Sequence, residues 1–88
     1  MDKEIYATIE LARLGKYLEF VVISTEEENR LPRGTKFRTT PFQWNKAYQG
    51  KASQIQTTTT AYNTVLFVGK FLLKYSPKDN TPYLTPAK

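Results

Sequence analysis

The sequence predicts a mainly β protein, a small antiparallel barrel of about five strands with at most one short helix. Apolar and polar residues alternate with a period of two near the amino terminus, as in a strand with one buried face. Further β-rich segments follow, each separated from the next by glycine, proline or other turn residues. The 88 residues are enough for one modest core, so residues 1–88 are expected to form a single domain.

The first half of the chain contains three predicted strands. Residues 3–12 and 17–24 are expected to pair as a hairpin, because the glycine in residues 13–16 permits a tight turn. Residues 25–34 are polar and end in Pro-Arg-Gly, which indicates a loop. Residues 35–39 then form a short strand.

The segment after this strand has two interpretations. Thr40 is a suitable helix cap, and Pro41 is well placed in a first helical turn, so a helix through Tyr48 that stops at Gly50 is one of them. The other is an irregular loop.

Two more strands and a tail complete the predicted fold. Residues 52–62 are rich in threonine, and residues 64–75 place alternate apolar residues on one face, with Gly69 as a bulge or a barrel bend. The proline-rich tail, residues 76–88, is expected to turn at residues 78–80 and to return as an edge strand. This succession of elements predicts an OB-like barrel.

The composition excludes several classes of enzyme and metal site. The chain has no cysteine and no histidine, so it has no thiolate nucleophile, no zinc-finger ligand set and no histidine general base. Glu4, Glu10 and Glu19 lie on predicted strands at spacings that do not suggest a metal cage. We therefore expect a non-enzymatic protein with no catalytic residues, no metal and no cofactor.

Charge is divided unevenly along the chain. Residues 1–30 contain four basic and seven acidic residues, whereas residues 31–88 contain nine basic residues and the single acid Asp79. A basic surface of this kind indicates a polyanion as partner, such as nucleic acid. The alternative is a solvated basic surface with no partner.

A segment that combines basic residues with aromatic rings points to single-stranded nucleic acid. Residues 36–51 contain four cations, four rings and no acid. Proteins that bind single strands use cations along the phosphates and flat rings on which bases stack. The candidate contacts in this segment, together with the preceding arginine, are Arg33, Lys36, Arg38, Phe42, Trp44, Lys46, Tyr48 and Lys51.

Each ring in this segment also has a structural interpretation. We expect Phe37 to fill the core. Trp44 and Tyr48 have polar or charged neighbours in the sequence, so either a surface position or a core position is compatible with the pattern.

Two further groups of charged residues have alternative interpretations. Lys70 and Lys74 are expected on one side of the same strand, where they either hold phosphates or protect an edge strand against aggregation. The acidic residues 26–28 form either a solvated loop or a contact with the basic face of another subunit.

Apolar runs are short throughout the chain. The initial methionine is followed by the charged residues Asp-Lys-Glu, and no apolar run approaches the roughly 18 residues that span a bilayer. We expect a cytoplasmic protein that does not contact membranes.

The chain also resembles a known family. Its length, its β-rich pattern, its scattered tyrosines and its ending Pro86-Ala87-Lys88 are similar to the gene V type single-stranded DNA-binding proteins of filamentous phages. The resemblance implies an OB-like viral protein that acts in DNA replication as a dimer, coating single-stranded DNA cooperatively. It assigns no role to individual residues of this chain.

The preferred hypothesis is therefore a binder of single-stranded DNA or RNA that acts as a homodimer. The alternative is a small viral protein-interaction module or inhibitor, whose basic aromatic face docks on an acidic host protein.

Overall fold

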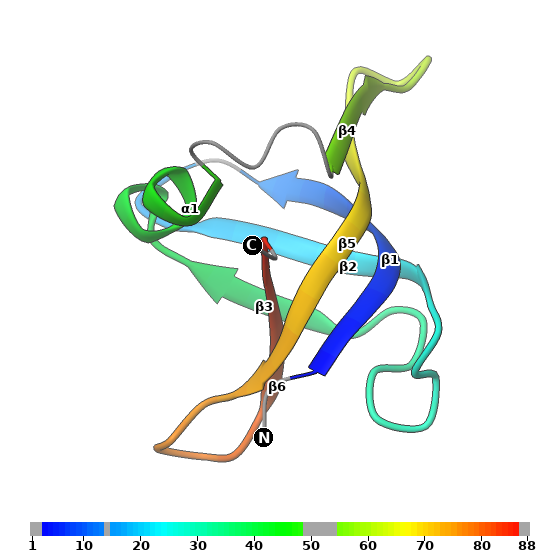
Figure 1. Ribbon diagram of the computed structural model, residues 1–88. Helices are drawn as coiled ribbons and strands as arrows, with labels where there is room; N and C mark the ends of the chain where they lie inside the picture. The colour runs from blue at the N-terminus through cyan, green and yellow to red at the C-terminus, as the bar shows by residue number, and fades with distance from the viewer. Residues whose placement is uncertain (1–2, 14, 49–54, 87–88) are drawn as a thin grey trace.

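The computed structural model describes residues 3–13, 15–48 and 55–86, and for Arg13, Ala47 and Tyr48 it describes the backbone alone. The elements follow the chain in the order β1 (Lys3–Arg13), β2 (Leu18–Thr25), β3 (Lys36–Thr39), α1 (Pro41–Tyr48), β4 (Ile55–Thr59), β5 (Val65–Tyr75) and β6 (Pro82–Pro86) (Figure 1). The prediction of a mainly β fold with one short helix is confirmed. No helix in the described part of the chain is long and apolar enough to cross a membrane.

The strands form one antiparallel sheet in the order β3-β2-β1-β5-β4, with β6 also paired to β5. The long strand β5 pairs along one edge with β1. Its other edge pairs first with β4 and then with β6. The sheet curls until β6 contacts β3, but no β pairing joins these two strands in the described residues. The fold is therefore a curled antiparallel sheet that stays open between β3 and β6, so the predicted OB-like barrel is matched only loosely.

The β1–β2 hairpin confirms the prediction from the alternating pattern. Ile5, Ala7 and Ile9 are buried, while Tyr6 on the opposite face is exposed. Such alternation is expected where one face of an antiparallel sheet covers the core and the other meets water. The register with β2 shifts after Thr8, which gives the strand pair a local irregularity.

Strand β5 has the predicted buried face, but it has no bulge towards β1. The register between β1 and β5 runs without a shift from Lys3 opposite Leu73 to Leu11 opposite Val65. Gly69 instead lies where the outer partner of β5 changes from β4 to β6. β5 is strongly curved along its length, as the predicted barrel bend requires (Figure 1).

The helix interpretation of the segment after β3 is correct. The Thr40 hydroxyl accepts the backbone N–H of Gln43 at 3.1 Å, which satisfies a donor that the first turn leaves unpaired. Pro41 occupies the first position of α1, where a missing N–H costs nothing. The predicted stop at Gly50 and the start of the predicted strand at residues 52–54 lie outside the described residues.

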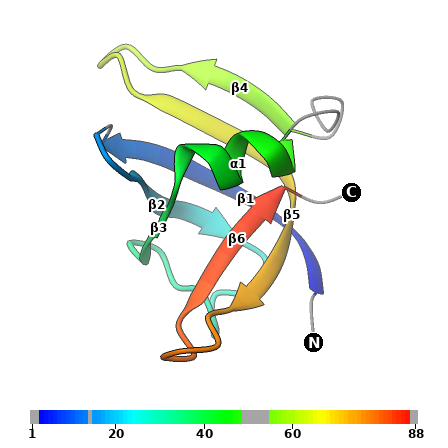
Figure 2. The ribbon, with the colours of Figure 1, turned by 90° about the vertical axis from the view of Figure 1, so that its left-hand side faces the viewer.

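Three aromatic rings from different elements meet in the core. The ring centroid of Trp44 lies 4.6 Å from that of Phe20 and 5.2 Å from that of Phe67. Phe37 stacks on Phe20 at 5.4 Å, so its predicted core position is confirmed. α1 thus contributes its tryptophan to the core, and it lies in front of the curled sheet with β4 above and β6 below (Figure 2).

The described part of the tail forms the predicted edge strand, β6, with a turn before it. Asn80 adopts a positive φ of 59°, and the Asp79 carboxylate accepts hydrogen bonds from the backbone and hydroxyl of Thr81. These contacts close the turn and direct β6 back along β5. β6 thereby forms one wall of the gap in the barrel.

Candidate nucleic-acid interface

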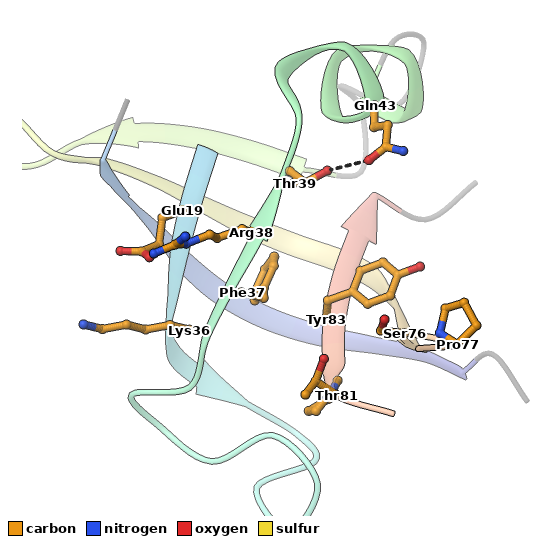
Figure 3. A pocket seen from close by; sticks show the side chains of 11 residues that line it. Glu19, Lys36, Phe37, Arg38, Thr39, Gln43, Ser76, Pro77, Thr81 and Tyr83 are labelled. Carbon is orange, nitrogen blue, oxygen red and sulfur yellow. Dashed lines mark hydrogen bonds and ion pairs between the residues drawn. The ribbon is translucent and has the colours of Figure 1, made fainter. Parts of the chain in front are cut away.

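A groove with a volume of about 580 Å³ occupies the gap between β3 and β6 (Figure 3). We call it the β3–β6 groove. β3, the start of α1, the β5–β6 turn and β6 all contribute to it, together with one residue of β2. Its lining residues are Glu19, Lys36, Phe37, Arg38, Thr39, Gln43, Ser76, Pro77, Thr81, Pro82 and Tyr83.

Side chains of β3 point alternately to opposite faces of the sheet, and this determines which of them border the groove. Phe37 points into the core, so its neighbours Lys36 and Arg38 are exposed. Figure 3 shows both cations reaching over β2, away from Tyr83. They form a cationic rim along one side of the groove, and the half-buried Tyr83 stands on the other side.

Arg38 is held by an ion pair. Its Nε donates to Oε2 of Glu19, its register partner on β2, at 3.0 Å. The arginine side chain is 59% exposed and the glutamate side chain 15%. The other nitrogen atoms of a guanidinium can also donate hydrogen bonds, so Arg38 has the capacity to hold a second anion.

Two smaller hollows adjoin the groove and share Thr39 and Gln43 with it. One is bordered by Tyr17 and Arg38 on the side of the β1–β2 turn. The other is bordered by Lys74 and Tyr83 on the side of β5 and β6. The Thr39 hydroxyl donates to Oε1 of Gln43 at 3.4 Å, at the point where the three hollows meet. The result is a continuous surface with cations and rings on both sides.

The structure corrects the assignment of Trp44 as a surface ring that stacks on bases. Trp44 is 6% exposed and is packed between Phe20 and Phe67. A base cannot stack on either face of a ring that the core already covers. The rings that border the groove and its adjoining hollows with part of their surface open are Tyr17, which is 46% exposed, and the half-buried Tyr83.

The predicted contacts on α1 are partly described. Phe42 is 74% exposed, and the Lys46 ammonium lies 6.0 Å from the centre of its ring. Phe42 and Lys46 lie on the helix that begins beside the hollow at Tyr17, but neither residue lines the groove or the hollows described above. The side chain of Tyr48 and all of Lys51 lie outside the described residues.

Arg33 and Lys70 do not join the groove. Arg33 is exposed in the turn before β3 and borders none of the hollows described above. The Lys70 ammonium lies 3.8 Å from Oε1 of Glu4 and 5.5 Å from the centre of the Tyr6 ring. Lys70 and Lys74 share a face of β5, as predicted, but only Lys74 borders the groove surface.

The acidic segment at residues 26–28 is partly tied to β1. The Glu26 carboxylate accepts the backbone N–H of Tyr6. Glu27 pairs with Lys3 at 3.2 Å and lies 3.8 Å from Arg30. Because these carboxylates already have partners, the interpretation as a fully solvated loop is too simple.

The described residues offer no basis for a metal centre, since they contain no group of three or more acidic side chains close enough to hold an ion.

Sequence reasoning missed Thr39 and Tyr83 as part of the site. No local pattern could have identified them, because they come together only when β6 lies beside β3.

Comparison of the chain with known protein families, with curated protein sequences and with solved structures finds no match.

Proposed function

We propose that this protein binds single-stranded DNA or RNA, without catalysis, in the β3–β6 groove and the hollows that adjoin it. The observation that carries the proposal is the arrangement of β3: a cationic rim of Lys36 and Arg38 runs beside a groove whose far side carries Tyr83. The groove is lined by a single acid, Glu19, among the described residues.

The spacing of the rim suits an extended sugar–phosphate backbone. Lys36 and Arg38 are two residues apart on one strand, which corresponds to about 6.8 Å. This distance is similar to the repeat between phosphates of an extended single strand. With phosphates along the rim, the bases face the groove, where Tyr83 and Tyr17 offer rings on either side of Thr39 and Gln43.

The expected binding energy comes from both kinds of contact. Each stacked base contributes about 1–3 kcal/mol. Neutralising phosphates with four cations, Lys36, Arg38, Lys46 and Lys74, gives a slope of about −2.8 for log K against log salt concentration, from about 0.7 per phosphate of a single strand. Affinity should therefore fall roughly 50-fold between roughly 50 mM and roughly 200 mM salt.

The proposal includes a homodimer acting in the cytoplasm on single strands exposed during replication. An exposed patch on the outer face of the sheet supports a contact between copies. Tyr6 is 58% exposed, Ile23 36% and Val68 38%, and they lie on the three adjacent strands β1, β2 and β5. Sedimentation analysis that finds only the mass of a single chain at micromolar concentration would reject the dimer.

A titration of labelled oligonucleotides, followed by fluorescence anisotropy, tests the main proposal. Oligo(dT) of about 12 nucleotides, the matching RNA and a duplex are compared at the two salt concentrations. We expect the single strands to bind more tightly than the duplex, with the salt slope given above. Absence of binding to every oligonucleotide at low salt would refute the proposal and favour the protein-interaction module.

Matched variants locate the site. Arg38→Gln and Lys36→Gln should each weaken binding and reduce the salt slope by about 0.7. Arg33→Gln and Lys70→Gln make the same changes of charge outside the groove and should have much smaller effects. If the two pairs weaken binding equally, binding depends on net charge and the assignment to the groove is wrong.

A further inference from the structure

The one acid among the residues that line the groove is paired with a cation of its rim. Glu19 lies beneath the cationic rim, and its carboxylate accepts a hydrogen bond from Arg38 Nε at 3.0 Å. Its side chain is only 15% exposed, so water screens its charge less than that of a surface glutamate. Any phosphate that contacts Arg38 therefore approaches this carboxylate as well.

The opposite burial of the two partners makes their roles unequal. Glu19 lies on β2, an internal strand of the sheet, and is paired by register with Arg13 on β1 and Arg38 on β3. The Arg38 side chain is 59% exposed and reaches from the short strand β3. On binding, the arginine can therefore reorient towards a new anion, while the glutamate stays in place.

We propose that Glu19 is a competing anion, which holds Arg38 in the free protein and lowers the affinity of the groove for nucleic-acid phosphate. This inference rests on the proposed function and deepens it. Binding of a strand then exchanges one partner of Arg38 for another, or adds a second anion beside the first. In both cases the carboxylate opposes the phosphate. The role of Glu19 is to keep the complex readily reversible.

The variant Glu19→Gln tests the inference with little change in shape. The amide oxygen of glutamine still accepts a hydrogen bond from Arg38 Nε, so the arginine keeps its support while the negative charge is lost. We expect affinity for oligo(dT) at low salt to rise at least about threefold to tenfold, the effect of two unit charges about 3–6 Å apart when they are screened as in bulk water. The gain should shrink as salt increases.

Two controls separate this role from a general effect of charge. Glu4→Gln removes another ion-paired glutamate, which lies outside the groove beside Lys70. It should raise affinity less than Glu19→Gln. In the double variant Glu19→Gln with Arg38→Gln, the gain from removing the carboxylate should be smaller than in the presence of Arg38. Equal gains in either comparison would overturn the inference.

The outcomes distinguish this inference from the proposed function. If the wild-type protein binds oligo(dT) and Glu19→Gln binds equally well or more weakly, the competing role is wrong and the groove proposal stands. If neither protein binds, both are wrong. Circular dichroism verifies that the variant is folded, and Glu19→Thr, a strand-compatible replacement, provides a second test by the same measurement if the glutamine variant does not fold.

Discussion

Replacing Trp44 tests most directly whether its ring belongs to the core or to a binding surface. Its side chain is 6% exposed, with the rings of Phe20 and Phe67 at 4.6 and 5.2 Å. Truncation of a buried tryptophan to alanine costs about 3–5 kcal/mol. The whole free energy of unfolding expected for a chain of this size is about 4–13 kcal/mol. Trp44→Ala should therefore remove a large part of the stability.

Urea denaturation followed by far-ultraviolet circular dichroism measures this loss. Phe42→Ala is the matched control, because it truncates a ring of the same helix that is 74% exposed, and it should change stability by at most about 0.5 kcal/mol. Trp44→Phe, which keeps an aromatic ring, should be milder than Trp44→Ala. If Trp44→Ala costs under about 1 kcal/mol but abolishes oligonucleotide binding, the ring is at the surface and our description of the core is wrong.

Three further outcomes follow from local contacts. Thr40→Ala should lower the free energy of unfolding by about 1 kcal/mol through loss of the helix cap, whereas Thr40→Ser should retain most of it, both measured by urea denaturation. Hydrogen bonds from the Thr81 hydroxyl and backbone hold the pKa of Asp79 below its ordinary value of 3.8. The Asp79 carboxylate therefore stabilises the protein above pH 3.8, and this stabilisation is lost as the pH falls through the lowered pKa. Acid denaturation of Asp79→Asn should lack the part of the pH dependence that comes from this carboxylate. Tyr83→Ala should weaken oligonucleotide binding by about 1–3 kcal/mol in the anisotropy titration, whereas Tyr62→Ala, at a 90% exposed hairpin tip outside the groove, should not.

Local periodicity was sufficient to predict most of the strands. In β1 and β5, alternate residues share a face, so the apolar positions could be assigned directly from the sequence. The cap at Thr40 and the proline at Pro41 likewise predicted where the helix begins. These features depend on neighbours within a few residues, and the sequence contains that information.

The position of Trp44 shows why the immediate neighbours of a residue in the sequence can mislead about its burial. Gln43 and Asn45 flank it in the sequence and suggested a polar setting. In a helix, however, the neighbours on the same face are three and four residues away, so Gln43 and Asn45 do not share the face that carries Trp44. Pro41, three residues before Trp44, does share it. The helix therefore directs Trp44 into the core although its neighbours in the sequence are polar.

Pairing between strands that are distant in the sequence determines which cations lie beside a carboxylate. Lys70 meets Glu4 because β1 and β5 pair with a register that sets Tyr6 opposite Lys70. Arg38 meets Glu19 for the same reason on β2 and β3. A count of charges along the chain reveals neither pair. Such a count predicts a basic surface, but it does not show which cations have a carboxylate beside them.

The four residues of β3 link the stability of the protein to its proposed function. Because side chains alternate along a strand, the burial of Phe37 against Phe20 forces Lys36 and Arg38 outward. A shift of one residue in the pairing with β2 would place the cations in the core and the ring in water, at a large cost in free energy. The core contact that fixes the register therefore also fixes the cationic rim. A variant that loosens Phe37 is expected to lose both stability and oligonucleotide binding, whereas Arg38→Gln should weaken binding with a smaller loss of stability.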